Sequence, residues 1–555
     1  MTPNRPLVPA SLARGRHGGV VAPHHLATAT GLDILRSGGT AVDAAIATNA
    51  ALAVVMPQAC GLGGDAFWLI WDAGSRTETA LNGSGRAPAD ANPVRLRRAG
   101  LDRLPFRGPM SVTIPGAVRS WGDAHRRHGR LGRDRILASA IELARDGFPA
   151  DEAFIGSVER TATALGGALP DEGRAWASQF RPHGRPWRPG EIVRRPALGA
   201  TLERLADAGF DDFYEGELAA KLARGLKGAG SLITAGDLAD HLCTLADPIA
   251  TTYRGVEVTT HPPNSSGIVA LELLNVLECF EPPPASAFGP EGVADPGWVH
   301  LGIEAAKLAF ADRDAAVTDP VFHDVPVEHL LDRTYAAELA GRIHPSLAAL
   351  PPASTAPRGG GTIYLASVDA EGNAVSLIQS NYMGFGSGVV DAETGVHFQN
   401  RGSYFSLEPD HPNLLAPGKR TLHTLLPGML FRDGEPWVVV GSMGGDAQPQ
   451  IFAQVVSALV DGALDVASAI ASPRWFVEPA DHFAPPVEVT IEPRFAPETL
   501  AALESFGHPL HPAAPFDSAV GHCHAIELAA GGPGADEGGV AAATDPRSAG
   551  LPAVW

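Results

Sequence analysis

The sequence predicts an α+β fold in which sheets are layered between helices. Segments with helical periodicity dominate the chain up to about residue 345. After residue 361 the apolar pattern changes to the period of two that is typical of strands. A stretch rich in Pro, Ala and Gly at 345–361 separates the two regions. Helices and strands of this kind bury their apolar faces by packing in layers.

The helix-rich region begins with two helices and a hairpin. A helix over Leu26–Ser37 is expected to end at Gly38 and Gly39, and a second helix rich in small residues begins at Ala41. A tight turn over 61–65 leads into an apolar strand. The further elements expected in this region are strands at Ala66–Trp71, Thr77–Leu81 and Gly255–Thr260, helices at Ile136–Arg145, Leu198–Ala208, Glu217–Gly228 and Trp298–Ala315, and a turn over 262–267.

The strand-rich region contains two predicted hairpins. Thr362–Val368 and Ala374–Ser380 flank the turn DAEGN, and Met429–Arg432 and Pro436–Val440 flank Asp433 and Gly434. Together with the preceding helices they complete the mixed pattern.

Composition excludes several classes of function. The 42 Lys and Arg residues stand against 62 Asp and Glu, and the net charge of −20 disfavours binding to nucleic acid or to anionic membrane. The four cysteines are far apart and form no C-x-x-C pair, so neither a zinc ribbon nor a disulfide framework is indicated. No signal peptide is visible, and the apolar run 44–60 is interrupted by Asn49 and follows Asp43, so we expect a cytoplasmic protein.

The common short signatures of large enzyme families are absent, which leaves a less common nucleophile. The sequence has no H-E-x-x-H, Walker A or G-x-S-x-G motif. A Thr that opens a strand after a chain cut gains a free α-amine, which can take the proton from its own hydroxyl. Gly361-Thr362, where the linker meets the strand, is the place where such a cut is expected. This pattern alone is weak, because Thr commonly opens strands for conformational reasons.

The chain as a whole resembles the γ-glutamyltranspeptidase family. The blocks that carry the resemblance run in order along nearly the whole sequence and are GGVVAPHHLATATGLDILRSGGTAVDAAIATNAALAVVMPQACGLGGDAFWLI, FYEGELAAKLARGLKGAGSLITAGDLADH, YRGVEVTTHPPNSSG, HLGIEAAKLAFADRDAAVTDP, GGGTIYLASVDAEGNAVSLIQS, GSMGGDAQPQ and ATDPRSAG. The resemblance implies an N-terminal-nucleophile hydrolase with a four-layer αββα sandwich. It also implies self-cleavage into a large chain, 1–361, and a small chain, 362–555, which stay associated as one composite domain and could form a homodimer of the two-chain unit.

The resemblance also implies roles for individual residues. Thr362 matches the nucleophile and new N-terminus, and Ser380 stands in the place of a threonine whose hydroxyl assists it. Gly444 and Gly445 match the pair whose backbone N–H groups hold the oxyanion. The two remaining matches are Arg86, at the position that grips a substrate carboxylate, and Asn400, near the pocket.

Several positions depart from the family pattern. Tyr404 occupies an acidic position that contacts the glutamyl α-ammonium, and Arg401 stands where an uncharged or acidic side chain is usual. His423 and Thr424 replace paired serines, and Tyr382 replaces a common asparagine. The stretch between 405 and 419 is short for a lid loop. These changes resemble the branch that contains cephalosporin acylases and small-amide hydrolases.

We interpret the sequence as a self-processing amidase in which Thr362 attacks a γ-glutamyl-type amide and passes the acyl group to water or an amine. The alternative within the same class is an acylase or small-amide hydrolase acting on glutaryl-cephalosporin- or oxamate-type substrates, and the alternative outside it is a non-catalytic binding protein. The expected partner is a small amide that bears a carboxylate, and no cofactor or metal is expected. His522 and His524 share one face of a probable strand, with Cys523 opposite, and are interpreted as structural because no third ligand is recognisable.

Overall fold

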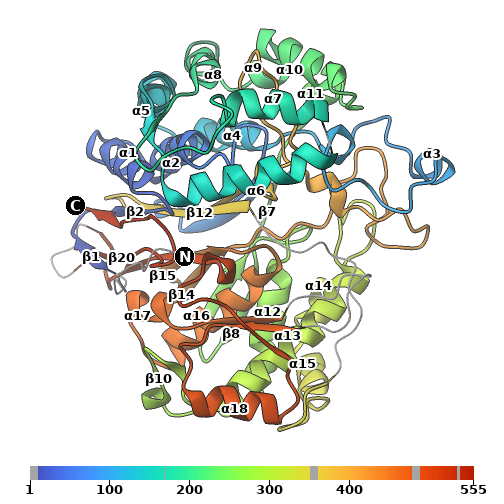
Figure 1. Ribbon diagram of the computed structural model, residues 1–555. Coiled ribbons are helices and arrows are strands. Elements are labelled where there is room, and N and C mark those ends of the chain that lie inside the picture. Colours follow the sequence, from blue (N-terminus) through green and yellow to red (C-terminus); the bar gives the residue numbers. More distant parts are fainter. Residues whose placement is uncertain (1–10, 169, 350–360, 478–487, 534–537) are drawn as a thin grey trace.

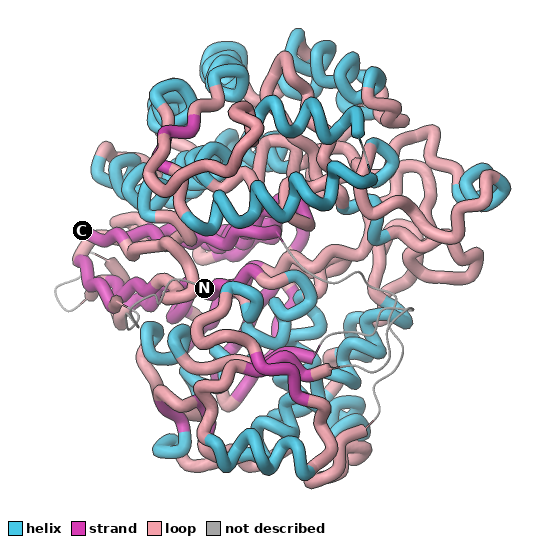
Figure 2. Tube along the Cα trace, viewed as in Figure 1, coloured by secondary structure: helices cyan, strands magenta, loops and turns pink. Residues whose placement is uncertain are grey.

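Two seven-stranded sheets lie face to face, and helices cover the outer face of each (Figures 1 and 2). This computed structural model describes residues 11–168, 170–349, 361–477, 488–533 and 538–555. The α+β class and the four-layer αββα sandwich are therefore confirmed. Most of the linker predicted at 345–361 lies outside the described residues.

The first sheet carries the start of the strand-rich region at its centre. Its strand order is β21-β2-β12-β13-β3-β4-β7, with Ala553–Val554, Gly19–Val21, Gly361–Val368, Ala374–Tyr382, Asp65–Asp72, Thr77–Gly83 and Thr244–Ala246. Every residue of β12 and β13 is buried, because helices cover one face of the sheet and the second sheet covers the other. Continuous apolar runs of this kind are expected of strands covered on both faces.

The second sheet has the order β1-β20-β19-β15-β14-β9-β8. The strands are Leu12–Gly15, Val540–Ala543, His522–Leu528, Glu435–Met443, Pro427–Arg432, Val256–Thr260 and Ile249–Tyr253. An apolar layer that includes Phe67, Tyr364, Ala366, Met429 and Val439 joins the two sheets. Gly441 lies under the Tyr364 ring, where an added Cβ would come within 2.3 Å, so glycine permits close contact between the sheets.

Helix α2 (Ala41–Val55) fits the buried position between the first sheet and the outer helices. All of its residues are buried, and most are Ala or other small side chains that allow close approach. Thr40 and Asp43 form a reciprocal capping box that satisfies the first N–H groups of the helix. The layer around it is completed by α1 (His25–Arg36), α4 (Ala117–His128), α5 (Arg133–Asp146), α6 (Glu152–Ala168), α7 (Pro170–Phe180), α8 (Pro196–Ala208) and α10 (Glu217–Gly228).

The helices on the second sheet form a separate apolar core with it. They are α12 (Gly267–Glu278), α13 (Pro296–Ala316), α16 (Gln448–Val460) and α17 (Val466–Ala471). The shorter helices are α3 (Pro93–Arg98), α9 (Asp212–Glu215), α11 (Ala235–Ala239), α14 (Val327–Leu330), α15 (Arg333–Ala340) and α18 (Pro497–Ser505). The remaining strands are β5 (Phe148–Pro149), β6 (Ile192–Val193), β10 (Phe288–Gly289), β11 (Gly292–Val293), β16 (Trp475–Val477), β17 (Val489–Ile491) and β18 (Leu510–Pro512).

The predicted elements are present, and their ends lie within three residues of the expected positions. For example, the helix expected over Ile136–Arg145 is α5, which begins earlier at Arg133. Among the described residues, no helix combines the length and the apolar character needed to cross a bilayer.

Candidate active site at the start of strand β12

A relay of two hydroxyl groups leads to the carbonyl at the predicted cut. Thr362 and Ser380 are cross-strand partners, and the register shifts between Gly361 and Thr362. The Ser380 hydroxyl donates to the carbonyl oxygen of Gly361 at 2.8 Å and lies 2.9 Å from Thr362 Oγ1. Because the single Ser380 proton points to Gly361, Thr362 is the donor to Ser380. The Tyr382 N–H also donates to Ser380 Oγ, at 2.7 Å, and fixes its position.

The peptide bond to be cut is tightly enclosed in the uncut chain. Thr362 is 2% exposed. A Cβ added to Gly361 would lie 2.8 Å from both the carbonyl oxygen of Gln58 and the N–H of Gly384. Glycine is therefore needed here because of close approach, whatever its dihedral angles.

A buried carboxyl group, that of Asp65, lies beside Ser380 on the next strand. Asp65 is the cross-strand partner of Ser380 in β3, and its Oδ2 lies 3.1 Å from Nε2 of His423. Burial raises the pKa of Asp65 to about 7, although Arg401 and the N–H of Gly85 oppose the shift. Burial also holds the pKa of His423 well below its usual range, with Arg401 adding to the effect. The imidazole is therefore neutral, and its Nε2 is the donor of this bond when Asp65 is ionised.

Arg401 and two tyrosines form the wall of the site beyond Ser380. The Arg401 guanidinium lies 4.0 Å from the centre of the Tyr382 ring and donates through Nη2 to Thr424 Oγ1 at 3.3 Å. The rings of Tyr382 and Tyr404 meet edge to face at 5.4 Å. Tyr382 has a φ of 72°, a left-handed conformation that is rare for a bulky residue and common at functional sites.

Gly444 and Gly445 lie at the same end of the sandwich as the predicted cut. The Tyr404 hydroxyl donates to Asp446 at 3.0 Å, so Asp446 is near Tyr382, the cross-strand partner of Gly361. The glycine pair directly precedes Asp446 at the end of β15 and the entry to α16. Gly444 and Gly445 have φ values of 146° and 58°, which favour glycine. This placement is compatible with backbone donors near the nucleophile.

Asn400 braces the chain after β13. Its Oδ1 accepts from the N–H of Met383 at 3.1 Å, and its Nδ2 donates to the carbonyl of Phe106 at 2.8 Å. Asn400 is fully buried, so it holds the backbone that carries Ser380 and Tyr382.

Arg86 is the predicted site residue that the structure places least directly. The N–H of its neighbour Gly85 donates to Asp65 Oδ1 at 2.9 Å, which places this loop beside Asp65. The Arg86 side chain, 24% exposed, donates to the carbonyl of Gly418 at 3.1 Å and lies 3.9 Å from Asp319. No contact between Arg86 and Thr362 is present in the described structure.

The family model described as gamma-glutamyltranspeptidase matches residues 27–555. The chain belongs to the γ-glutamyltranspeptidase family. It is 37% identical to the glutathione hydrolase-like YwrD proenzyme of Bacillus subtilis over 96% of this chain and 97% of that protein. It is also 37% identical to the oxamate amidohydrolase proenzyme of Klebsiella pneumoniae, over 97% of this chain and 98% of that protein. The cephalosporin acylase of Bacillus halodurans superposes with a TM-score of 0.90 at 37% identity and covers 100% of this chain and 99% of its own.

Membership of the γ-glutamyltranspeptidase family makes the chain an N-terminal-nucleophile hydrolase, as the sequence predicts. The substrate differs among these relatives by name, so the family alone leaves it open.

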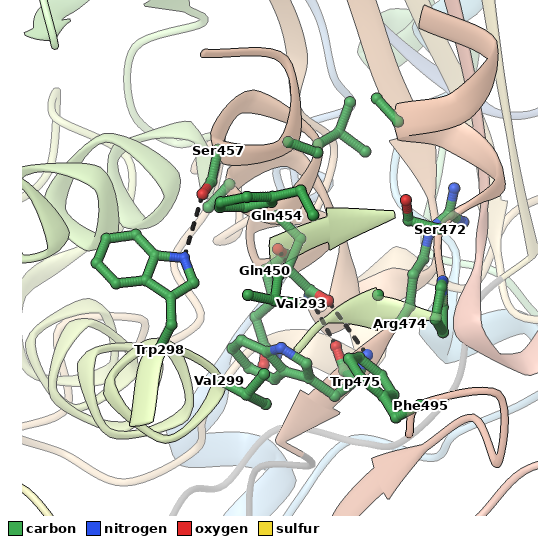
Figure 3. A pocket seen from close by; sticks show the side chains of 18 of the residues that line it. Val293, Trp298, Val299, Gln450, Gln454, Ser457, Ser472, Arg474, Trp475 and Phe495 are labelled. Atoms are coloured by element: carbon green, nitrogen blue, oxygen red, sulfur yellow. Dashed lines mark hydrogen bonds between the residues drawn. The ribbon is translucent and has the colours of Figure 1, made fainter. Parts of the chain in front are cut away.

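Two other features of the structure lie apart from the group formed by Thr362, Ser380 and Asp65. A cavity in the second core is lined by residues of α12, α13 and α16, together with Arg474 and Trp475 (Figure 3). Its polar side chains are engaged within the protein: Gln454 donates to the Trp475 carbonyl at 2.8 Å and Arg474 pairs with Asp545 at 2.7 Å. None of the predicted site residues lines this cavity.

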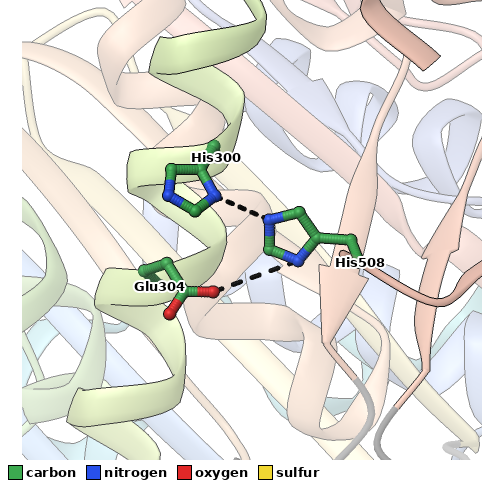
Figure 4. A group of neighbouring side chains, drawn as sticks. All are labelled: His300, Glu304 and His508. Atoms are coloured by element: carbon green, nitrogen blue, oxygen red, sulfur yellow. Dashed lines mark hydrogen bonds and ion pairs between the residues drawn. The ribbon is translucent and has the colours of Figure 1, made fainter. Parts of the chain in front are cut away.

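The second feature is a buried group of His300, Glu304 and His508 (Figure 4). His508 lies 2.7 Å from His300, and the ammonium of Lys307 is 2.6 Å from a Glu304 oxygen. The lysine therefore already supplies a positive charge beside Glu304, and His508 Nδ1, 3.9 Å from Glu304, is the ring nitrogen without a hydrogen-bond partner among the described residues. His522 and His524 belong to β19, and His524 Nδ1 accepts from the N–H of Asp545 at 3.1 Å.

Sequence reasoning missed Asp65 and Asp446 as parts of the site. Asp65 closes the tight turn over 61–65 and begins a strand, and Asp446 follows the glycine pair within the block GSMGGDAQPQ. The signal for Asp446 was its position directly after the predicted glycine pair, and Asp65 follows a glycine-rich turn. Their partners His423 and Tyr404 are distant in sequence and become visible only in the fold.

Proposed function

We propose that this hydrolase matures by cutting its own chain before Thr362 and then hydrolyses small amides with Thr362 as nucleophile. The observation that carries the proposal is the relay from Thr362 Oγ1 through Ser380 Oγ to the carbonyl of Gly361. The names of the Bacillus subtilis and Klebsiella pneumoniae relatives both include the word proenzyme, which supports maturation of this chain. The products would be chains 1–361 and 362–555.

In the maturation step, Thr362 Oγ1 bonds to the Gly361 carbonyl carbon and the bond to the Thr362 nitrogen breaks. The hydroxyl proton passes to that nitrogen, and water then hydrolyses the ester to release the Gly361 carboxylate and restore the hydroxyl. The Ser380 proton lies where negative charge develops on the carbonyl oxygen, which is the arrangement that stabilises an oxyanion.

In the mature enzyme the free α-amine of Thr362 serves as base, since its unperturbed pKa is about 7.7–8.0. Thr362 attacks the substrate amide, the amine leaves, and water releases the acyl group as a carboxylic acid. Gly444 and Gly445 are proposed to donate to the oxyanion. Arg86 is proposed as one contact for a carboxylate on the substrate.

The preferred acyl group is a carboxylate-bearing one that lacks an obligatory α-ammonium. Tyr404, which stands at the family's acidic position, uses its hydroxyl on Asp446, and Asp446 also pairs with Arg313. Asp446 is therefore already engaged and is not free to pair with the α-ammonium of a glutamyl group. The second candidate is γ-glutamyl hydrolysis, which the name of the Bacillus subtilis relative favours.

Two measurements test the proposal. On a denaturing gel the wild type should separate into two chains, whereas Thr362→Ala should remain full length and inactive and Thr362→Ser should still be cut. Kinetics on glutaryl and γ-glutamyl p-nitroanilides should favour the glutaryl compound. If Thr362→Ala were cut normally, Thr362 would not be the nucleophile. A strong preference for the γ-glutamyl compound would establish the second candidate, γ-glutamyl hydrolysis.

A further inference from the structure

Arg401 is a buried cation whose hydrogen-bonding capacity is largely unused. The side chain is 1% exposed. Its Nη2 makes one long bond to Thr424, whereas Nε and Nη1 are without a hydrogen-bond partner among the described residues. Burying an arginine in this way is costly unless an anion completes its environment.

The acidic groups around Arg401 are already engaged by other residues. Asp65 is hydrogen-bonded to His423 and accepts from the N–H of Gly85. Asp446 accepts from Tyr404 and pairs with Arg313. Both carboxylates favour the charged guanidinium through space, but neither hydrogen bonds to it. Nε and Nη1 of Arg401 are therefore buried donors that no carboxylate of the described residues accepts from.

The position of Arg401 relative to the nucleophile suits a substrate group. Its guanidinium rests on the Tyr382 ring, and the Tyr382 N–H donates to Ser380, which contacts Thr362. The stacking on the Tyr382 ring and the bond to Thr424 restrain the guanidinium. The second N–H of Nη2, together with Nε or Nη1, can grip a carboxylate through two parallel hydrogen bonds.

We propose that Arg401 binds the carboxylate of the substrate's acyl group and thereby selects monoamides of dicarboxylic acids. This inference rests on the proposed amidase function and names its substrate class. Arg401 is the specificity-determining residue, whereas Arg86 is held by Gly418 and Asp319 and contributes less. An acyl group that ends in a neutral amide would leave the buried cation unpaired.

The test compares charged and neutral substrates of the same shape. The mature wild type, Arg401→Gln and Arg86→Gln, which removes the other proposed carboxylate contact, are assayed on two pairs of substrates. Each pair consists of a succinyl or glutaryl p-nitroanilide and its counterpart with a terminal carboxamide in place of the carboxylate. The ratio of kcat/KM for charged over neutral substrate should fall about 10- to 100-fold in Arg401→Gln, the effect of one charged hydrogen-bond pair. Arg86→Gln should change it less, and Arg401→Lys, which keeps the charge without the fork, should lie between wild type and Arg401→Gln.

An unchanged ratio in Arg401→Gln, or a larger fall in Arg86→Gln, would overturn the inference. Calorimetric titration of glutarate and of its neutral diamide into the mature proteins gives a second readout that needs no turnover. Wild type should bind glutarate more tightly than Arg401→Gln does, and the diamide should show no such difference. If wild type shows this binding pattern but cleaves no amide, the proposed amidase function is wrong and the anion site is supported. If wild type and Arg401→Gln bind glutarate equally, the anion site is wrong. Should Arg401→Gln fail to mature, Arg401→Lys replaces it, and equal glutarate binding by wild type and Arg401→Lys then counts against the fork.

Discussion

Removal of the Ser380 hydroxyl is expected to slow self-cleavage severely while leaving the fold intact. The hydroxyl contacts the attacking group, Thr362 Oγ1, at 2.9 Å and the carbonyl oxygen that it attacks, on Gly361, at 2.8 Å. Loss of one such oxyanion donor typically costs about 2.7–4 kcal/mol, or about 100- to 1000-fold in rate. Ser380→Ala should therefore mature at least about 100-fold more slowly than wild type.

A second effect of Ser380→Ala acts on stability and has to be separated from the first. The buried N–H of Tyr382 loses its acceptor, which typically costs about 1–3 kcal/mol. Ser376→Ala is the matched control, because Ser376 is buried on the same face of β13 and bonds to Tyr364 and to the N–H of Gly428. It should lower stability similarly and mature at the wild-type rate.

The assay follows full-length chain and products on denaturing gels after a pulse of cell-free synthesis, with thermal unfolding measured in parallel. Ser380→Thr keeps the hydroxyl and should mature. The reasoning is refuted if Ser380→Ala matures as fast as wild type, or if Ser376→Ala is slowed equally.

The remaining predictions concern the cut site, a buried carboxyl group and the histidine cluster. Gly361→Ala should slow maturation and lower stability by about 1–3 kcal/mol, because its Cβ would clash with backbone. Gly228→Ala, which has open space around the added Cβ, should be neutral or slightly stabilising. Equal behaviour of the two variants in unfolding and gel assays would contradict this prediction. The carboxyl of Asp65 has its pKa raised to about 7 by burial, so the folded state binds more protons than the unfolded state between about pH 4 and 7, and this contribution to stability is lost as pH rises. The melting temperature of Asp65→Asn relative to that of wild type should accordingly rise from pH 4 to pH 8. A difference in melting temperature that does not change with pH would contradict the raised pKa of Asp65. Chelation or added Zn²⁺ should leave the melting temperature unchanged because Lys307 occupies the cation position beside Glu304, and a rise of several degrees with Zn²⁺ would indicate a metal site.

Periodicity predicted the elements well and their ends less well. The small-residue pattern after Ala41 matched a fully buried helix, and the alternation after residue 361 matched β12 and β13. Helix ends depend on capping bonds, and β13 runs on to Tyr382 because that residue pairs with Gly361. No local pattern shows that this strand lies between helices and a second sheet; the family resemblance supplied that arrangement.

The site could be predicted only as far as single positions. Thr362 and Ser380 were expected to cooperate, and the register brings their hydroxyls together. Arg401 appeared in the sequence only as a departure from the family pattern. Its unused N–H groups and its place on the Tyr382 ring result from burial among residues far apart in sequence. Electrostatic surroundings of this kind arise from the packed fold, so composition and spacing do not reveal them.

The cut exchanges one proton acceptor for another, and this separates the two reactions of the site. Before maturation the Thr362 nitrogen belongs to a peptide bond and cannot act as a base, so the Ser380 oxygen is the acceptor placed at the hydroxyl. Afterwards the free amine is present with an unperturbed pKa of about 7.7–8.0. Ser380→Ala protein that has matured after long incubation should therefore lose less in kcat than it lost in maturation rate. Equal losses would mean that Ser380 contributes alike to both reactions, which would contradict this separation.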